Sequence, residues 1–531
     1  MNNNKSKHAL LSVSALALMG TMLTPAASWA MDGETVIQEK CLSCHTRTGN
    51  PETPYSRISQ QRKTPEGWQM TLQRMQHRNG LVLSSEETQA VIRYLSDTQG
   101  LAPSEAAPFR YVLEQQPNVV EDVDPAYAEM CARCHSNARF GLQRRTEGEW
   151  KELVNTHMAI HPTTELHALA RDRRWYDIAL NETAPKLAMD YAFNDVAWKQ
   201  WQKVAKPKLE GSWSVAGYMP VKGDYSAVLK VVETSDNKYS VTLDGHYADG
   251  SLLRGNGAAQ VFSGYEWRAG LTIDGVSMRQ VLAASTDGTS LTGRMYQSAH
   301  DEIGGELKAV NGSAIVGLSP TALKQGETSQ VTIFGGYLKG SVNLGAGVKV
   351  VKVLSRDADR VVVEAKASAS ASVGMRDVAV GATKAKAQLA VYDKVAAVQV
   401  SPPQSLARIG GNGGKLPKVQ STYRALAFSA GADGQPGTDD DMRLGYMPAA
   451  WSLKPQNEVA EEDRDVEFAG TIDSNGIFTP GDAGLNPQRR MSTNNVGMLK
   501  VVASVKDGDN TVEGESDLLV AVPSYIKRAI Q

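Results

Sequence analysis

The stretches Cys41-Leu42-Ser43-Cys44-His45 and Cys131-Ala132-Arg133-Cys134-His135 both have the form C-x-x-C-H. This is the attachment motif of c-type haem. Two thiols about one helical turn apart can each add to a haem vinyl group, and the adjacent imidazole then reaches the iron as proximal ligand. We therefore expect two covalently bound haem c groups. The attachment residues are Cys41, Cys44 and His45 for the first haem and Cys131, Cys134 and His135 for the second.

The two motifs use all four cysteines of the chain, which excludes a disulfide-dense scaffold. A thioredoxin-like redox pair would need a βαβ setting and no histidine. A zinc site would hold its two cysteine pairs roughly 15–20 residues apart. Here the pairs begin at residues 41 and 131, which favours haem over both alternatives.

The spacing of the motifs predicts a tandem repeat of two cytochrome c units, residues 31–105 and 106–207. Each unit should supply a distal ligand to its iron. After the helix start at Thr64-Pro65, one helix face carries Trp68, Leu72 and Met75. After the second motif, the corresponding face carries Trp150, Val154 and His157. The predicted sixth ligands are therefore Met75 and His157, a thioether and an imidazole.

Three other residues remain candidates for the distal ligands. His77 lies on the opposite side of the first helix and competes only if that helix ends before it, which Asn79-Gly80 would allow. At 100° per residue around the helix axis, His161 lies on the same face as Trp150, whereas Met158 lies about 80° away from that face.

The first thirty residues have the pattern of a secretory signal. Lys5 and Lys7 precede an apolar run, and Ser28-Trp29-Ala30 then places small residues where a signal peptidase cuts. The apolar run is shorter than the ~20 residues that span a bilayer. We expect an exported chain, cut near Ala30, without a membrane span. A formal net charge of -2 offers no basic excess for nucleic acid, so no nucleic-acid partner is expected.

The expected fold class is multidomain, with a mainly α dihaem cytochrome c region followed by all-β domains, since 531 residues exceed what one core can serve. A capping box at Ser84 and Glu87 starts a helix that runs to Gly100, and residues 101–125, which are rich in proline and polar residues, read as a linker. Alternating runs with turn signals then predict an up-and-down antiparallel β-barrel over 208–312. An immunoglobulin-like sandwich should follow over 313–395, and a C-terminal immunoglobulin-like β domain over 396–531.

Two loops in the β region have motif-like sequences. Residues 409–416 look like a phosphate loop, but Ile409 replaces the first glycine and Leu416 replaces the Ser or Thr that binds magnesium, so we expect a turn. An acidic loop from Asp433 to Asp441 could hold calcium through carboxylate oxygens, although it departs from the EF-hand pattern. Whether it binds calcium stays open.

The order of these parts resembles the alpha subunit of quinohaemoprotein amine dehydrogenase. The resemblance covers the whole chain, from CLSCH and CARCH through Gly211-Ser212-Trp213 at the start of the barrel to the SPTALKQGE segment at 319–327. It implies a periplasmic heterotrimer in which a small subunit carries cysteine tryptophylquinone and oxidatively deaminates primary amines. A second partner is a β-propeller. The alpha subunit then passes electrons from the quinone to a soluble copper protein or cytochrome c.

No catalytic residue is expected on this chain, because the resemblance places amine oxidation on another subunit. Two other functions remain open: a dihaem electron carrier of another periplasmic dehydrogenase, and a dihaem peroxidase. A peroxidase needs one iron with a vacant or displaceable distal site, so two distal candidates favour electron transfer.

Overall fold

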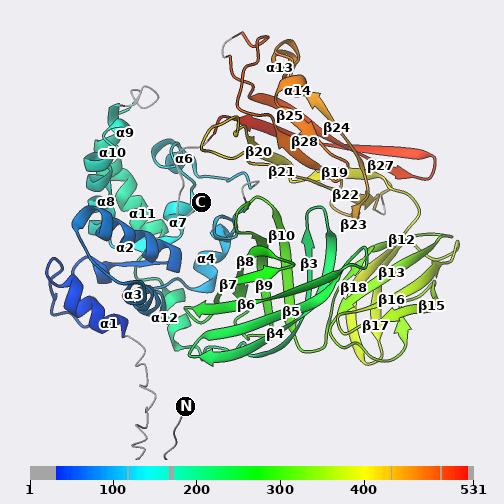
Figure 1. Ribbon diagram of the computed structural model, residues 1–531, viewed down its shortest axis with the longest axis horizontal. Coiled ribbons are helices and arrows are strands. Elements are labelled where there is room, and N and C mark those ends of the chain that lie inside the picture. The colour runs from blue at the N-terminus through cyan, green and yellow to red at the C-terminus, as the bar shows by residue number, and fades with distance from the viewer. Residues whose placement is uncertain (1–31, 117–118, 167–172, 432, 491–492, 524–531) are drawn as a thin grey trace, which may run out of the picture.

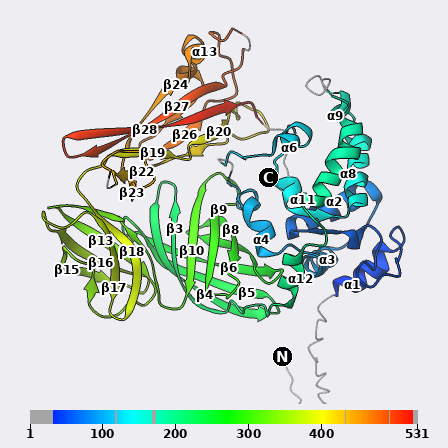
Figure 2. The ribbon, with the colours of Figure 1, turned by 180° about the vertical axis from the view of Figure 1, so that it is seen from behind.

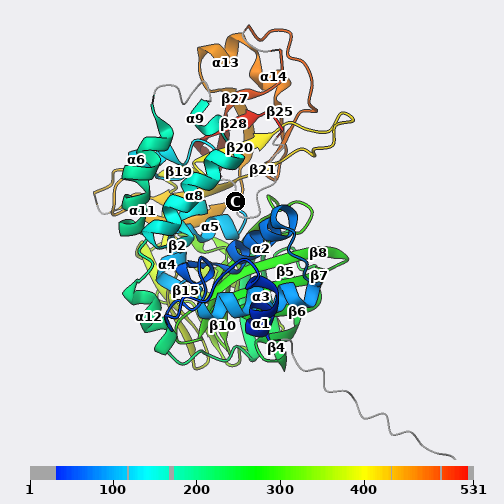
Figure 3. The same ribbon diagram turned by 90° about the vertical axis from the view of Figure 1, so that its left-hand side faces the viewer.

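The computed structural model describes residues 32–116, 119–166, 173–431, 433–490 and 493–523, and the signal predicted over 1–30 lies outside them. A helical N-terminal region is followed by many β-strands, as the sequence predicts (Figure 1). The helical region lies against one side of a β-barrel, and Figure 3 looks onto its helices with the barrel strands behind them. Among the described helices, none is both long and apolar enough to cross a membrane.

The first half of the helical region is built on α2 (Pro65–Asn79) and α3 (Ser85–Thr98). Both begin where the sequence predicts. The Thr64 hydroxyl accepts from the Gly67 N–H, and Ser84 and Glu87 form the capping box. The first motif is reached through α1 (Gly33–Val36) and η1 (Ile37–Cys41), and α1 packs against α3 at Gly33. Between the motif and α2 lie η2 (Ile58–Gln60) and β1 (Gln61–Lys63).

The second half repeats this arrangement around α8 (Glu147–Ile160). Thr146 caps α8 by accepting from the Glu149 N–H, as Thr64 caps α2, and the strand β2 (Gln143–Arg145) precedes it as β1 precedes α2. The remaining elements of this half are α6 (Pro125–Met130), α7 (Ala138–Gly141), α9 (Thr163–Leu166), α10 (Trp175–Ile178), η5 (Ala179–Thr183), α11 (Ala184–Asp190) and α12 (Val196–Lys203).

The two halves are joined by an antiparallel ladder of β1 and β2, in which Arg62 lies opposite Arg144. Both arginines bind the carboxylate of Glu105. The Arg62 guanidinium donates to both Glu105 oxygens at 2.9 Å, and the Arg144 Nε donates to Oε1 at 3.0 Å. All three side chains are buried, so the one carboxylate partly compensates two positive charges away from water.

The prediction of a linker over 101–125 is wrong for the first part of that stretch. It forms α4 (Pro103–Ala106), η3 (Ala107–Phe109) and α5 (Arg110–Leu113), and Leu101 and Ala106 are buried in the core that includes the barrel. Pro103 and Pro108 stand in the first turns of these helices, where the missing N–H costs no hydrogen bond. The prolines therefore mark helix starts rather than a free linker.

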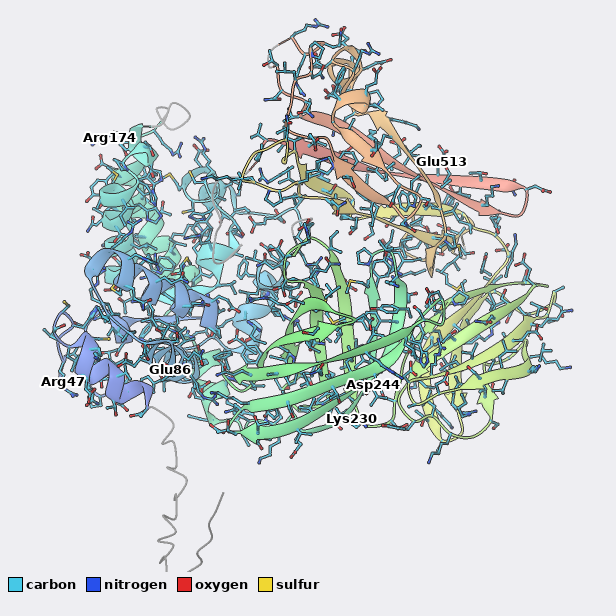
Figure 4. The ribbon with its side chains drawn as sticks, viewed as in Figure 1. Arg47, Glu86, Arg174, Lys230, Asp244 and Glu513 are labelled. Carbon is cyan, nitrogen blue, oxygen red and sulfur yellow. The ribbon has the colours of Figure 1, made fainter. Side chains whose placement is uncertain are left out.

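The predicted antiparallel barrel is confirmed, and it has eight strands. Each strand pairs with its neighbours in the sequence, and β10 pairs with β3 to close the sheet. Side chains alternate between core and solvent; Lys230 and Asp244 point outward in Figure 4, whereas Trp213 and Trp267 are fully buried. The strands are β3 (Gly211–Met219), β4 (Gly223–Ser235), β5 (Lys238–Tyr247), β6 (Leu252–Phe262), β7 (Glu266–Ile273), β8 (Val276–Ala284), β9 (Ser290–Gln297) and β10 (Gly304–Asn311).

After the barrel, two four-stranded sheets enclose a separate hydrophobic core. The first sheet has the order β11-β13-β16-β15 and the second β12-β18-β17-β14. The strands are β11 (Ile315–Ser319), β12 (Ala322–Lys324), β13 (Thr328–Gly335), β14 (Val342–Asn343), β15 (Val348–Arg356), β16 (Arg360–Ala367), β17 (Gly374–Val380) and β18 (Thr383–Tyr392).

The C-terminal part lies above the barrel in Figures 1 and 2 and shares a hydrophobic cluster with β12 and β18. Its sheets have the orders β19-β22-β23, β20-β28-β27-β24 and β21-β26-β25. The elements are β19 (Ala397–Ser401), β20 (Gln404–Arg408), β21 (Ser421–Thr422), β22 (Arg424–Ser429), β23 (Met442–Met447), β24 (Ala450–Pro455), α13 (Glu458–Glu462), α14 (Asp465–Phe468), β25 (Gly470–Ile472), β26 (Ile477–Pro480), β27 (Gly497–Asp507) and β28 (Asn510–Ala521).

Candidate haem sites

The first C-x-x-C-H motif forms a tight turn at the end of η1. The backbone N–H groups of Cys44 and His45 both donate to the Cys41 carbonyl, at 3.1 and 3.0 Å. The Nδ1 of His45 lies 3.0 Å from the Ser56 carbonyl oxygen. In the tautomer that donates this bond, Nε2 keeps its lone pair, which is how metal-ligating histidines are usually oriented.

A cavity of about 600 Å³ opens beside this motif, within the range of roughly 300–1,000 Å³ that ligand and cofactor pockets show. Cys41, Cys44, His45 and Met75 all line it. The structure therefore brings together the motif and the distal ligand that we predict for it. Two thiols, an imidazole with a free Nε2 and a thioether around an enclosed space are the donor set of a covalently attached haem, so these residues fit the group.

His77 does not share this cavity. Helix α2 continues through Asn79 and ends at Gly80, whose backbone is left-handed, so the early helix end that His77 would need does not occur. His77 is exposed, whereas Met75 is half-buried and its sulfur accepts from the Asn79 side-chain amide at 3.5 Å. The placement favours Met75.

The far wall of the first cavity comes from the second half of the helical region. Leu153, Thr156 and Ile160 line it along one face of α8. Trp150 and Val154 point to the other side of the same helix, into the hydrophobic cluster around the second motif. Helix α8 is therefore a wall shared by the two candidate sites.

The second motif follows α6, which ends at Cys131. Cys131 packs at the edge of the cluster that contains Trp150. His135 is half-buried, its Nδ1 lies 3.0 Å from the Ser136 carbonyl oxygen, and its ring centroid lies 6.5 Å from that of Phe140. A contact from Nδ1 to a carbonyl oxygen is the kind that orients metal-ligating histidines.

His157 lies on α8 beside this cluster, where its ring centroid is 6.0 Å from that of Trp175. Its Nδ1 lies 2.8 Å from the Leu153 carbonyl oxygen, which leaves Nε2 free in the corresponding tautomer. Burial lowers the pKa of His157, so its imidazole is held neutral, the form that binds iron.

The two alternatives to His157, which are His161 and Met158, are less well placed to act as the distal ligand. Helix α8 ends at Ile160, so the helical spacing that would return His161 to the Trp150 face does not reach it, and His161 is exposed. The two imidazole centroids are 6.4 Å apart. Met158 packs against the hydrophobic cluster. His157 is the better placed of the three, and its ligation remains a prediction.

Burial disfavours the thiolate form of two of the four cysteines. None of the four forms a disulfide, and burial raises the pKa of Cys41 and raises that of Cys131 to about 12. Redox-active and zinc-binding cysteines need the thiolate. Within the described ranges, no group of three or more His, Cys, Asp or Glu side chains could hold a metal ion.

The described residues of the acidic loop, which leave out residue 432, likewise contain no group of side chains that could hold a metal ion. Its carboxylates are engaged within the loop: Asp441 accepts from the N–H groups of Gly431 and Gly437 at 3.2 and 2.7 Å, and Asp433 accepts from Gln435 at 2.8 Å. Residues 409–416 form the predicted turn, closed by a bond of 2.9 Å from the Gly411 N–H to the Leu416 carbonyl.

Two functional candidates escaped the sequence prediction. Lys63 and Arg145 line the first cavity although both are buried. A signal was present, since Gln61-Arg62-Lys63-Thr64 and Gln143-Arg144-Arg145-Thr146 stand at equivalent places before the two aligned tryptophans.

Solved structures resemble parts of the fold at low similarity. A redesigned β-barrel, mFAP1, bound to DFHBI is 18% identical, covers 20% of this chain and 94% of its own, and has a TM-score of 0.18. The Bacteroides ovatus mixed-linkage glucan utilization locus protein SGBP-B, in complex with a heptasaccharide, is 11% identical over 59% of this chain and 64% of its own, with a TM-score of 0.20. These scores carry no argument about function. No curated protein matches the sequence.

Four family models match nearly the whole of the chain. The haem-binding model of the quinohemoprotein amine dehydrogenase alpha subunit matches residues 31–198. The models of alpha-subunit domains II, III and IV match residues 206–312, 313–393 and 398–530. The four follow one another in the order of the helical region, the barrel and the two later β parts. The chain therefore belongs to the family of quinohemoprotein amine dehydrogenase alpha subunits.

Proposed function

We propose that this chain is the electron-transfer subunit of a periplasmic amine dehydrogenase and carries two c-type haems. The observation that supports this most directly is the first cavity, where Cys41, Cys44 and His45 meet Met75. When bound, a haem supplies one-electron redox chemistry at its iron. The chain's own residues attach the group, orient the imidazole through the Ser56 carbonyl and shield the site with apolar walls from both halves.

The proposed ligand pairs are His45 with Met75 and His135 with His157. A thioether ligand raises the reduction potential, whereas a second imidazole leaves it lower. The second site is then suited to receive electrons from the partner's cysteine tryptophylquinone, and the first to pass them to a soluble copper protein or cytochrome c. Both proposed sites adjoin helix α8, which supports transfer between them.

The chain is proposed to work in a heterotrimer with a quinone-bearing small subunit and a β-propeller subunit. All four cysteines belong to the haem motifs, so none remains to form the quinone crosslink here. We further propose cleavage of the signal near Ala30, and an immunoglobulin-like topology for the two β parts after the barrel, which would serve as docking surfaces.

The test is to export the chain with haem maturation and measure its mass. The expected addition is two haems that survive acid–acetone extraction, because thioether bonds are covalent. Replacing Cys131 and Cys134 by Ala should remove one haem and leave the other. Finding one haem or none in the unmodified chain would overturn the proposal.

A second measurement separates electron transfer from enzymatic alternatives. The purified chain should accept electrons yet oxidise no amine until the quinone-bearing partner is added. A peroxidase would need an open distal site, and the positions of Met75 and His157 favour two filled ones. Rapid peroxide turnover by the purified chain would favour the peroxidase instead.

A further inference from the structure

The first haem cavity has an unusual charge balance. Most charged side chains of this protein are on its surface, as are those labelled in Figure 4. Five cationic side chains line this cavity and only one carboxylate does: Arg57, Lys63, Arg74, Arg78 and Arg145 against Glu149. A partly apolar cavity with excess positive charge is built for an anionic ligand.

Lys63 is the most telling of these residues. It is 1% exposed, and buried lysines normally have a charged partner. Its ammonium group donates to the Thr71 hydroxyl at 2.7 Å and lies 5.0 Å from the Trp68 ring centroid. Within the described residues it makes no ion pair. Burial lowers the pKa of Lys63 well below its ordinary value, and the charge of Arg145 lowers it further.

The β1–β2 ladder explains how Lys63 and Arg145 reach the same cavity. Lys63 pairs with Gln143 and Gln61 pairs with Arg145, so Lys63 and Arg145 are diagonal neighbours on one face of the ladder. On the opposite face, Arg62 and Arg144 both bind the Glu105 carboxylate directly. The cavity face has only Glu149, which lies 3.6 Å from Arg145 and is also bound by Arg57 at 3.0 Å.

Two buried acceptors at the cavity also lack a hydrogen-bond donor. Gln61 Oε1 and Glu149 Oε2 are enclosed without a hydrogen bond. Buried polar atoms are almost always satisfied in native proteins. These oxygens need donors, which a carboxylate cannot supply, so the case for an anionic ligand rests on Lys63, which is buried without an ion pair among the described residues.

We propose that Lys63 and Arg145 bind the carboxylate substituents of the haem attached at Cys41 and Cys44. This inference rests on the proposed function, since it requires that haem. Haem carries two propionate groups, which provide the anionic charge that the cavity lacks. Because Arg145 belongs to the second half of the helical region, each half contributes a cation and the first haem site is complete only when both are folded.

The proposal has a consequence for the first haem's potential. A positive charge held near the iron in a dry site favours the reduced form, whose net charge is less positive. Removing the charge of Lys63 should therefore lower the potential of the first haem. The second haem, on the other side of α8, should respond less.

The experiment is a redox titration of the haem-loaded full chain as Lys63→Met, Lys63→Arg and Lys40→Met. Lys40 is the matched control, because it stands next to Cys41 in the sequence but is exposed and pairs with Glu87 at 3.7 Å. In Lys63→Met, the oxidised-to-reduced ratio of the first haem should shift at least tenfold, which is about 59 mV for a one-electron couple. Lys63→Arg and Lys40→Met should shift it by no more than about threefold, since one keeps the charge and the other is screened by water.

If Lys63→Met folds poorly, the number of haems bound per chain is measured as a second readout. Loss of the first haem in Lys63→Met but not in Lys63→Arg supports the proposal, because only the charge distinguishes those outcomes. Equal behaviour of the two variants, or a shift in Lys63→Met no larger than in Lys40→Met, would overturn it. A wild-type chain that carries two haems while Lys63→Met is unaffected refutes this inference and leaves the proposed function intact; a wild-type chain without haem refutes the proposed function itself.

Discussion

Glu105 is expected to be the side chain that contributes most to holding the two halves of the helical region together. Its carboxylate accepts from Arg62 at 2.9 Å on both oxygens, from the Arg144 Nε at 3.0 Å and from the Ala102 N–H at 2.7 Å. Glu105 is 5% exposed. Glu105→Gln keeps the shape but leaves two buried guanidinium groups without a counter-charge.

Removing one partner of a buried ion pair typically costs about 3–5 kcal/mol. The total stability of a domain is only about 5–15 kcal/mol, so the variant should unfold far more readily than the wild type. The assay is urea unfolding of the haem-loaded chain, followed by the Soret circular dichroism, which reports on the helical region rather than on the β domains. Glu147→Gln is the control, because its bond of 2.6 Å to Lys151 is exposed and is worth at most about 1 kcal/mol.

The pH dependence gives an independent check. Burial raises the pKa of Glu105, but Arg62 and Arg144 outweigh it and the net pKa is lowered. Its stabilising contribution is therefore present above the unfolded pKa of roughly 4.3 and is lost as the pH falls through the folded value. Glu105→Gln should lack that acid loss. If it destabilises the helical region no more than Glu147→Gln, the reasoning about the ladder is wrong.

Three further predictions concern the haem ligands and one buried acid. Met75→Ala should abolish the near-infrared charge-transfer band of methionine-ligated ferric haem, and His77→Ala should keep it; the reverse would move the ligand to His77. His157→Ala should remove the bis-imidazole signal from the electron paramagnetic resonance spectrum, and a loss in His161→Ala instead would identify His161 as the ligand. Burial raises the pKa of Glu266 to about 8, so its contribution to stability is full below roughly pH 4.3 and is lost as the pH rises through 8. Glu266→Gln should flatten the thermal stability profile across that range, and a slope equal to that of the wild type would contradict the assignment.

The features predicted well from the sequence were those with local causes. Thr64-Pro65 starts α2 and the capping box starts α3, because the side chain that caps a helix lies within three residues of the N–H it binds. The barrel followed from strand alternation and short turns. The first motif and Met75 share a cavity because helical spacing placed Met75 on the face of Trp68.

What escaped prediction depended on contacts between distant residues. The strands β1 and β2 are three residues long, too short for a periodic signal, and they pair across eighty residues of sequence. Lys63 and Arg145 are charged residues that would ordinarily be placed on the surface. Residues 101–113 read as a linker because proline marks both loops and first helical turns, and only the packing of Leu101 and Ala106 against the barrel tells the two apart.

The β1–β2 ladder has a consequence for how such a protein can change over evolutionary time. Each three-residue strand is the other's partner in a two-stranded sheet, and each half supplies an arginine to one shared carboxylate. Deleting either half would expose an unpaired strand edge, and deleting the first half would also leave Arg144 buried without the Glu105 carboxylate. Simple truncation to one half is therefore a costly step for this fold, and the two halves are expected to be kept and folded together.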